Sequence, residues 1–378
     1  MEHRQYVIAG SGLAAFSAVL GIRSVDRTGT IAMFGSERHP PYDRPPLSKS
    51  LWKGEPFESI WKPADGLDFE LFSGTKIVSI DPKNRVAVDD SGRGWGYDRL
   101  LLATGGSPRH LPFAEDGVLY LRTVDDYLRI RNACESDQEV VVIGGGFIGS
   151  EIAAALCMNG KKVTMIFPEK GIGARAYPTD LSEFLNGYYR EKGIRVLSSD
   201  TVSALWKESG RYFVKTASGE EIAAGCVVAG IGIAPESSLA EAAGLEVGNG
   251  ILVDELLRTK QPEIYAAGDV ANFYSPCLSM RMRVEHEDNA RTMGEIAGKN
   301  MAGEENPYTH LPFFYSDLFD LGFEAVGMLD SSLEIHSDWQ EPYRKGVLRY
   351  SKEGKVRGVL LWNTWGQVEQ ARRLICEG

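Results

Sequence analysis

The sequence contains one pattern twice: a short apolar run, a glycine loop and then a helix-like segment. The first loop reads GxGxxA and ends at Ala15, whereas the second reads GxGxxG and ends at Gly149. A second apolar run follows each loop, and an acidic residue comes 22 positions after Ala15, at Glu37, and 20 after Gly149, at Glu169. One such loop alone is a weak signal, but two copies with complete spacing predict two dinucleotide-binding sites.

The chemistry of each loop follows from its residue types. The first glycine allows a tight strand-to-helix turn, the second lets the backbone approach a pyrophosphate, and the third small residue lets helix and strand pack closely. The helix N-terminus adds free N–H groups and a positive dipole end, and the later carboxylate accepts from ribose hydroxyls. We therefore expect one pyrophosphate at Gly10, Gly12 and Ala15 and the other at Gly144, Gly146 and Gly149.

Coarse secondary structure supports an α/β chain with a repeated module. Helices are expected over 16–22 and 150–158, and the second strands over 30–34 and 162–167. Short strands then follow each module, over 75–80, 85–88, 97–103, 194–197, 204–206, 212–216 and 226–229. From residue 306 onward aromatic-rich strands and a closing helix at 367–375 indicate a further α+β domain.

Composition excludes several classes of protein. With 378 residues, 43% hydrophobic and 25% charged, the chain is long enough for two or three domains with their own cores. The net charge of −11 argues against nucleic acid or an anionic membrane as the main partner. We expect no membrane span and no targeting segment, and therefore a cytoplasmic protein.

The cysteines are few and scattered, and no CxxC pair occurs. This spacing is typical of reduced thiols and indicates neither a disulfide framework nor a zinc site. We expect reduced thiols at all five: Cys134, Cys157, Cys226, Cys277 and Cys376.

Several motifs together resemble an FAD- and NAD-linked reductase of the ferredoxin-reductase-like group, and within it apoptosis-inducing factor most of all. They are PPLSK at 45–49, ATGG at 103–106, GGGFIGSE at 144–151, FPEKG at 167–171, AGD at 267–269, RVEH at 283–286, SD at 316–317 and GFEAVG at 322–327. The resemblance covers essentially the whole chain. It implies two Rossmann-like domains of the glutathione-reductase type plus the C-terminal α+β domain.

The same resemblance implies domain boundaries. The FAD-binding domain would comprise 1–106 and 230–305, the NAD-binding domain 107–229, and the C-terminal domain 306–378. The FAD contacts that it implies, beyond the loop glycines, are Leu13, Ala14, Glu37, Arg44, Lys49, Val78, Thr104, Gly105, Arg122, Gly268 and Asp269. For Arg44 and Lys49 the alternative is an ordinary solvated basic loop.

Near the reacting ring, the resemblance implies a Lys49–Glu151 ion pair and a shielding aromatic at Phe147. Alternatively, Glu151 only complements its helix dipole and Phe147 is an ordinary packing residue. Tyr315 stands where most relatives have tryptophan. Glu285 and His286 would lie near the nicotinamide; a metal site is disfavoured there because consecutive residues point apart. The remaining NAD contacts implied are Ile148, Glu169, Arg175, Gly232, Glu324 and Asn363, with Arg175 replacing a lysine.

These residues imply an oxidoreductase that uses FAD and NADH, with NADPH disfavoured by Glu169. Disulfide reductases of this fold carry cysteine after the first loop, but the segment here reads PPLSKSLW. Electrons would therefore leave for an external acceptor, either a ferredoxin- or rubredoxin-like protein or a quinone-type molecule. The second hypothesis is an NADH-gated redox sensor with slow turnover. A basic docking face at Arg281, Arg283, Arg291, Arg372 and Arg373 would favour the first. The sequence leaves open whether the chain forms a homodimer.

Overall fold

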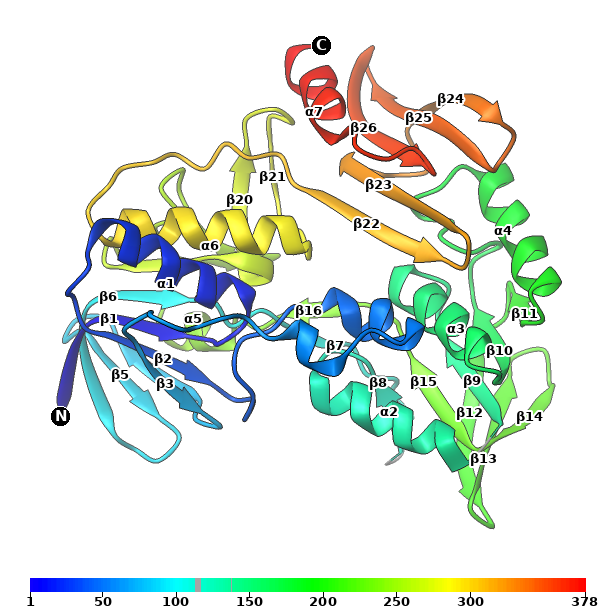
Figure 1. Cartoon of the computed structure of the whole chain (residues 1–378), viewed down its shortest axis with the longest axis horizontal. Helices are drawn as coiled ribbons and strands as arrows, with labels where there is room; N and C mark the ends of the chain where they lie inside the picture. The colour runs from blue at the N-terminus through cyan, green and yellow to red at the C-terminus, as the bar shows by residue number, and fades with distance from the viewer. Residues whose placement is uncertain (113–116, 137) are drawn as a thin grey trace. The chain divides into compact units, whose positions relative to one another are not determined.

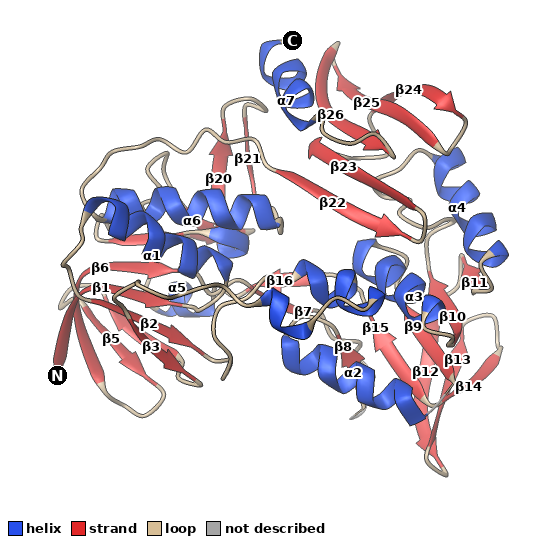
Figure 2. Ribbon diagram, viewed as in Figure 1, coloured by secondary structure: helices blue, strands red, loops and turns tan. Residues whose placement is uncertain are grey.

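The computed structural model describes residues 1–112, 117–136 and 138–378 (Figure 1). The chain forms two compact units, each assembled from three separate stretches. Unit 1 comprises 1–43, 60–107 and 234–313, and unit 2 comprises 44–59, 108–233 and 314–378. Figure 2 distinguishes their helices from their strands. Among the described residues, no helix is long and apolar enough to cross a membrane.

Unit 1 is built on a sheet with the order β3-β2-β1-β6-β5-β4, and β19 pairs with residues 100–102 of β6, beyond the residues 94–96 that pair with β5. The strands are β1 (Glu2–Ala9), β2 (Ile31–Gly35), β3 (Glu70–Ser73), β4 (Ile77–Asp81), β5 (Val86–Asp89), β6 (Gly94–Leu102) and β19 (Ile264–Ala266). Strands β3, β2, β1, β6 and β19 are parallel, whereas β4 and β5 form an antiparallel extension. The apolar residues of β1, β2, β6 and β19 are almost completely buried, as expected of a parallel sheet covered on both faces.

Helices α1 (Leu13–Val25) and α6 (Glu287–Met301) lie side by side in unit 1 (Figure 1). Their closeness depends on glycine. A Cβ on Gly294 or Gly298 would collide with the backbone of α1, and a Cβ on Gly21 would collide with the backbone of α6. The first glycine loop enters α1 directly, so this packing fixes the axis of the helix whose N-terminus faces the loop.

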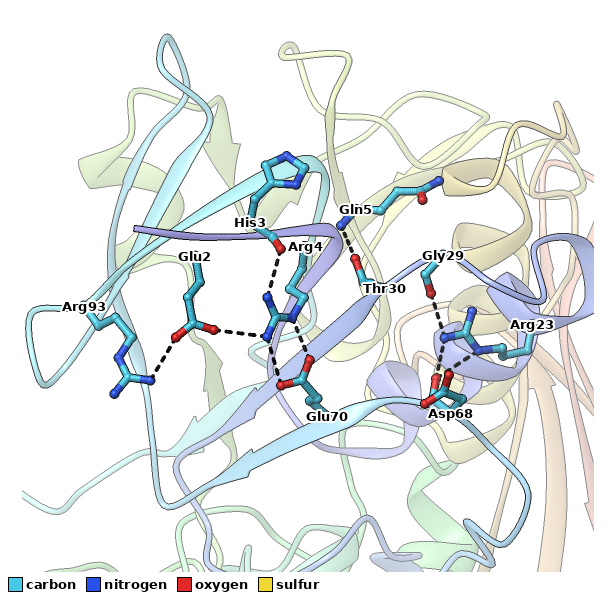
Figure 3. Close-up of polar contacts among 10 residues, drawn as sticks. All are labelled: Glu2, His3, Arg4, Gln5, Arg23, Gly29, Thr30, Asp68, Glu70 and Arg93. Carbon is cyan, nitrogen blue, oxygen red and sulfur yellow. Dashed lines mark hydrogen bonds and ion pairs between the residues drawn. The ribbon is translucent and has the colours of Figure 1, made fainter.

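Polar contacts fasten the N-terminal end of this sheet (Figure 3). The Arg4 guanidinium on β1 bonds both carboxylate oxygens of Glu70 on β3, at 2.6 and 3.1 Å, and pairs with Glu2. The Arg23 guanidinium at the end of α1 donates to the carbonyl oxygens of Asp68 and Gly29. The Arg4 contacts thus tie β3 to the strand that leads into the first loop, and the Arg23 contacts tie the end of α1 to the residues just before β2 and β3.

The rest of unit 1 consists of short elements, most of them in its third stretch, 234–313. A four-stranded sheet has the order β17-β18-β20-β21. Its strands are β17 (Val247–Gly248), β18 (Gly250–Leu252), β20 (Ala271–Ser275) and β21 (Met280–Met282), accompanied by α5 (Ser238–Ala242) and the 3-10 turn η4 (Gly268–Val270). Strand β7 (Gly106–Pro108) pairs with β16 (Ile233–Pro235).

Unit 2 contains a second parallel sheet with the order β11-β10-β9-β15-β8. Its elements are β8 (Val118–Tyr120), α2 (Val124–Ser136), β9 (Glu139–Ile143), α3 (Phe147–Met158), β10 (Lys162–Phe167), α4 (Thr179–Glu191), β11 (Arg195–Ser198) and β15 (Cys226–Ala229). An antiparallel meander of β12 (Val202–Glu208), β13 (Arg211–Thr216) and β14 (Glu221–Ala224) packs beside it. This is the expected second copy of the module.

The same unit includes the C-terminal sheet and an N-terminal segment. The sheet has the order β22-β23-β26-β25-β24 and consists of β22 (Phe313–Leu318), β23 (Leu321–Gly327), β24 (Glu334–Glu341), β25 (Lys345–Lys352) and β26 (Lys355–Trp362), followed by α7 (Val368–Glu377). The segment 44–59, which we call the strap, contains three 3-10 turns, η1 (Pro45–Ser48), η2 (Ser50–Lys53) and η3 (Phe57–Ile60).

Two expectations about local structure need correction. Helices α1 and α3 begin three residues earlier than predicted, at Leu13 and Phe147, because the second glycine of each loop is itself the N-cap. The expectation that all cysteines are reduced is also wrong: Cys134, Cys157 and Cys226 lie outside any disulfide, but Cys277 and Cys376 are disulfide-bonded.

Candidate active site

The first glycine loop has the geometry that a pyrophosphate requires. Gly10 has φ +125°, and a Cβ there would collide with the carbonyl oxygen of Ala103, so only glycine fits. Gly12 is the N-cap of α1 with φ −79° and ψ −170°, and a Cβ there would meet nothing within 4 Å. No side chain caps this helix end, so its N–H groups and the space beside Gly12 remain for a ligand.

The second loop has nearly the same backbone angles and glycine contacts as the first. Gly144 has φ +118° and a Cβ there would collide with the Gly230 carbonyl oxygen. Gly146 is the N-cap of α3 with φ −80° and ψ −170°, again without a side-chain cap and with open space around it. A Cβ on Gly149 would collide with the Gly144 carbonyl oxygen, which explains the third small residue. Both loops therefore fit a dinucleotide pyrophosphate.

The two acidic residues have different environments. Glu37 Oε2 accepts a 2.5 Å hydrogen bond from the Tyr42 hydroxyl, which fixes one side of that carboxylate. Glu169 Oε1 accepts from Arg175 Nε at 2.9 Å and pairs with the same guanidinium at 2.7 Å. The Arg175 side chain is 87% exposed, so this pair is easily exchanged for contacts with a ligand.

Other predicted FAD contacts in unit 1 lie on rigid turns. The Thr104 hydroxyl donates to the Glu236 carbonyl oxygen at 2.7 Å, while the Gly105 carbonyl accepts from the Glu236 N–H at 3.0 Å. Gly268, at φ +79°, opens the turn η4 that contains Asp269. Leu13 and Ala14 form the first turn of α1, whereas Val78 is an exposed residue of β4.

Arg283 has a role that sequence reasoning missed. Its guanidinium donates to the Asp269 carbonyl oxygen at 3.0 Å and to Asn249 Oδ1 at 3.0 Å, and it pairs with Glu285 at 2.9 Å. The side chain is only 9% exposed. Arg283 therefore joins the Asp269 turn to Glu285, two groups that we had assigned separately. The RVEH motif marked the residue, but it gave no indication of these partners.

His286 immediately precedes α6 and is its N-cap residue. Burial lowers the pKa of His286 to about 4, and the nearby carboxylates of Asp269 and Asp288 oppose this shift only partly. The imidazole is therefore neutral at physiological pH, so one of its ring nitrogens is a donor and the other is an acceptor. A neutral donor–acceptor group suits contact with a polar ring edge.

In unit 2 the expected Lys49–Glu151 ion pair is confirmed. Lys49 Nζ lies 2.7 Å from Glu151 Oε2, and the two side chains are 9% and 3% exposed. Two hydroxyls that we had not assigned complete the arrangement: Ser48 Oγ donates to Oε2 at 2.6 Å, and Ser316 Oγ donates to Oε1 at 2.6 Å. Glu151 thus does more than complement the dipole of α3, because its carboxylate is held at both oxygens.

The strap that carries Lys49 is fastened to α3 and β22. Trp52 Nε1 donates to the Leu47 carbonyl oxygen at 2.7 Å, which folds the strap on itself. Asn159 Nδ2, just after α3, donates to the Trp52 carbonyl oxygen at 2.9 Å. Lys53 Nζ lies 2.7 Å from Asp317 on β22. The rigid Pro-Pro turn and these contacts define the position of Lys49.

Aromatic residues surround the start of α3. The Phe147 ring lies 5.1 Å from Phe314 and 6.1 Å from both Tyr177 and Phe323, centroid to centroid. Phe147 therefore is a packing residue; whether it also shields a flavin stays a prediction. Lys49 Nζ lies 5.2 Å from the centre of the Tyr315 ring, an attractive cation–π arrangement.

Other predicted contacts in unit 2 have structural partners. Arg44 donates to the Arg122 carbonyl oxygen at 2.5 Å, and Glu324 accepts from the Gly366 N–H at 2.9 Å. Asn363 accepts from the Gly322 N–H at 2.8 Å through its side chain. Gly232 has φ +95° and Ile148 is 41% exposed in the first turn of α3. Their roles toward NAD stay predictions.

The residues considered for a basic docking face are mostly engaged within the chain. Arg281 donates to the carbonyl oxygens of Asn272 and Val253. Arg291 pairs with Glu287, and Arg372 pairs with Glu369. These contacts, with those of Arg283 above, give Arg281, Arg283, Arg291 and Arg372 partners within the chain, and a carboxylate is among the partners of the last three.

Comparison with known proteins shows the family of the chain. The family described as "Pyridine nucleotide-disulphide oxidoreductase" matches residues 4–294, and that described as "Apoptosis-inducing factor, mitochondrion-associated, C-term" matches 297–341 and 334–377. Apoptosis-inducing factor 1, mitochondrial, from Dictyostelium discoideum is 34% identical over 99% of this chain and 79% of its own length.

A bacterial reductase and a solved complex are similarly close. Putidaredoxin reductase from Pseudomonas putida is 33% identical over 85% of this chain and 80% of its own length. The crystal structure of the covalent putidaredoxin reductase–putidaredoxin complex matches with a TM-score of 0.92 at 30% identity, over 100% of this chain and 94% of that one. The chain resembles both ferredoxin reductases and apoptosis-inducing factor, and it uses FAD and NADH. With its two dinucleotide loops, the chain therefore belongs to the pyridine nucleotide-disulphide oxidoreductase family and is an FAD-dependent NAD(P)H oxidoreductase.

Proposed function

We propose that this chain transfers electrons from NADH, through FAD, to a small iron–sulfur carrier protein of the ferredoxin type. A bound FAD supplies the required chemistry, since it accepts a hydride and releases electrons singly or in pairs. The loop at Gly10 and Gly12 would hold the FAD pyrophosphate, and the loop at Gly144 and Gly146 would hold that of NADH. Glu37 and Glu169 would accept from the respective ribose hydroxyls.

The observation that carries this proposal is the buried Lys49–Glu151 pair. Lys49 lies in the strap, which follows the first glycine loop in sequence, at the place where disulfide reductases of this fold carry their cysteines, and Glu151 lies on α3. Lys49 would bring a positive charge to the reacting end of the flavin, and Glu151 would hold that charge in place. Without a thiol there, electrons would have to leave the flavin for an external acceptor.

The choice of acceptor is supported by the relatives. One relative is named as a reductase of putidaredoxin, and a solved structure contains such a reductase joined to putidaredoxin. A quinone-type small molecule is the other acceptor that we considered. The cytoplasmic location stays a prediction, because another relative is named as mitochondrial.

Steady-state turnover with a panel of acceptors tests the proposal. We expect NADH-dependent reduction of a ferredoxin-type protein with kcat/KM in the range of ordinary enzymes, about 10⁴ M⁻¹s⁻¹ or more, and far lower values for a quinone. Uniformly slow turnover with every iron–sulfur protein, alongside rapid quinone reduction, would refute the protein acceptor.

The disulfide-bonded Cys277 and Cys376 require a separate test, because a reducible disulfide could itself accept electrons. We expect the number of thiols titrated under denaturing conditions to be the same before and after anaerobic reduction with NADH. Two additional thiols after NADH treatment would show that a cysteine pair takes part in the reaction.

The second candidate function is an NADH-gated sensor, favoured by the similarity to an apoptosis-inducing factor. Its signature would be a long-lived complex of the reduced protein with NAD⁺, visible as a broad long-wavelength absorption band and slow to react with oxygen. Anaerobic NADH titration followed by air exposure distinguishes the two. Reoxidation as fast as after dithionite reduction would leave a plain reductase.

A further inference from the structure

Three successive residues of β22 contact the machinery around Lys49. The Tyr315 ring lies 5.2 Å from Lys49 Nζ, the Ser316 hydroxyl lies 2.6 Å from Glu151 Oε1, and the Asp317 carboxylate lies 2.7 Å from Lys53 Nζ. This strand opens the C-terminal sheet, so one edge of that sheet contacts both the strap and α3. The middle contact is the one that reaches the buried carboxylate.

Ser316 interrupts an otherwise apolar row. Side chains alternate along a strand, so Phe314, Ser316 and Leu318 share one face of β22. Phe314 packs against Phe147, and Leu318 is 1% exposed. Ser316 is equally buried, also at 1% exposure, where packing alone would favour another apolar residue. Its hydroxyl instead donates to an anionic carboxylate, which makes a stronger bond than a neutral acceptor does.

The two carboxylate oxygens of Glu151 accept from different numbers of donors. Oε2 accepts from both Ser48 Oγ and Lys49 Nζ. Oε1 accepts from Ser316 Oγ, and across the described ranges of the chain no other side chain donates to it. Loss of the Ser48 hydroxyl would leave Oε2 with its lysine. Loss of the Ser316 hydroxyl would leave a buried carboxylate oxygen without a donor, and the carboxylate would then be free to rotate.

We propose that Ser316 is a positioning residue for the Lys49–Glu151 pair, so that a hydroxyl of the C-terminal sheet sets the reduction potential of the flavin. Ser316 acts through Glu151: it fixes the plane of the carboxylate, and the carboxylate fixes the Lys49 ammonium. This rests on the proposed function, in which the pair lies at the reacting end of the flavin.

Redox titration of the FAD-loaded full chain tests the proposal with a matched set of variants. Ser316→Ala removes the hydroxyl without changing net charge, and Ser316→Thr restores a hydroxyl. Ser182→Ala is the control, because Ser182 is also 1% exposed in unit 2 but donates to the Ile172 carbonyl oxygen. Glu151→Gln removes the carboxylate charge itself. FAD content and Tm are measured for each variant.

We expect Ser316→Ala to shift the flavin midpoint potential in the same direction as Glu151→Gln, by a smaller amount, and to slow flavin reduction by NADH roughly three- to tenfold. Ser316→Thr should return the potential toward the wild-type value, and Ser182→Ala should leave it unchanged. If Ser316→Ala fails to fold, Ser316→Cys replaces it, because cysteine has nearly the same shape and is a weaker donor. The midpoint potential of Ser316→Cys should then lie between those of the wild type and Glu151→Gln.

The contrary results separate the inference from the proposed function. Wild-type potentials in Ser316→Ala or Ser316→Cys, together with a clear shift in Glu151→Gln, would overturn the role of Ser316 and leave the proposed function standing. An unshifted potential in Glu151→Gln as well would overturn both, since the pair could not then lie beside the flavin. A shift in Ser182→Ala as large as that in Ser316→Ala would reduce Ser316 to general packing.

Discussion

At the scale of single residues, the Lys49–Glu151 pair was predictable from the family resemblance, whereas its hydroxyl partners were not. Lys49 and Glu151 are opposite charges in recognisable motifs, and the structure pairs them at 2.7 Å. Ser48 and Ser316 hold the same carboxylate but come from positions 103 and 165 residues away from it. A serine has no charge or periodicity that indicates such a distant partner. Arg283 was noted as part of the RVEH motif and of a basic docking face, but its side chain is only 9% exposed and contacts Asp269, Asn249 and Glu285.

The pH dependence of stability provides a residue-scale prediction for His286. Because burial lowers its pKa from 6.5 to about 4, the unfolded chain binds more protons than the folded chain between those two values. His286 therefore lowers the free energy of unfolding progressively as the pH falls from about 6.5 to about 4, and the loss stays constant at lower pH. We expect that His286→Asn lacks this pH-dependent loss, which is on the order of 1–3 kcal/mol in the free energy of unfolding. Urea unfolding of both proteins at several pH values measures it. Parallel pH profiles for wild type and variant would contradict this assignment.

Cofactor preference provides a second residue-scale prediction. The Arg175 guanidinium pairs with Glu169 and would also attract a 2′-phosphate, which weakens discrimination against NADPH. Arg175→Ala should raise the ratio of kcat/KM for NADH over NADPH roughly two- to fivefold, in line with an exposed ion pair. Glu169→Gln is the converse variant and should lower the ratio. Equal ratios in all three proteins would show that neither residue contacts the ribose.

At the scale of elements, the duplicated loops were predictable and the helix boundaries were not. Glycine disfavours helix in general, so the helices were expected to begin after the loops. In both loops, however, the second glycine is an extended N-cap, and the helix starts at the next residue. Helix α6 was not predicted either, because Gly294 and Gly298 interrupt its pattern. Those glycines are needed for its close approach to α1.

The second loop offers an element-scale prediction with its own matched control. Gly146→Ala adds a Cβ in open space at φ −80°, so Tm should hardly change, but the KM for NADH should rise about tenfold or more because the Cβ obstructs the pyrophosphate. Gly144→Ala, at φ +118° against the Gly230 carbonyl, should instead destabilise the fold by about 2 kcal/mol or more. An unchanged KM in Gly146→Ala would argue against a nucleotide at this loop.

At the scale of the whole molecule, the sequence indicated a duplicated α/β chain, and both parallel sheets agree with it. The assignment of segments to compact units was harder to anticipate. The strap at 44–59 packs with the second module and the C-terminal sheet, although it follows the first loop in sequence. Its anchors are long-range contacts such as Asn159 with Trp52 and Lys53 with Asp317, which local patterns do not encode. The three-domain boundaries stay a prediction.

The central claim is that NADH reduces an FAD held by this chain. Anaerobic titration of the purified protein with NADH, followed in the main visible absorption band of the flavin, tests it most directly. Non-covalent FAD should be released by acid precipitation, and stoichiometric NADH should bleach the band rapidly, with NADPH acting more slowly. A correctly folded protein that takes up no FAD, or whose flavin stays oxidised in excess NADH, would contradict the account.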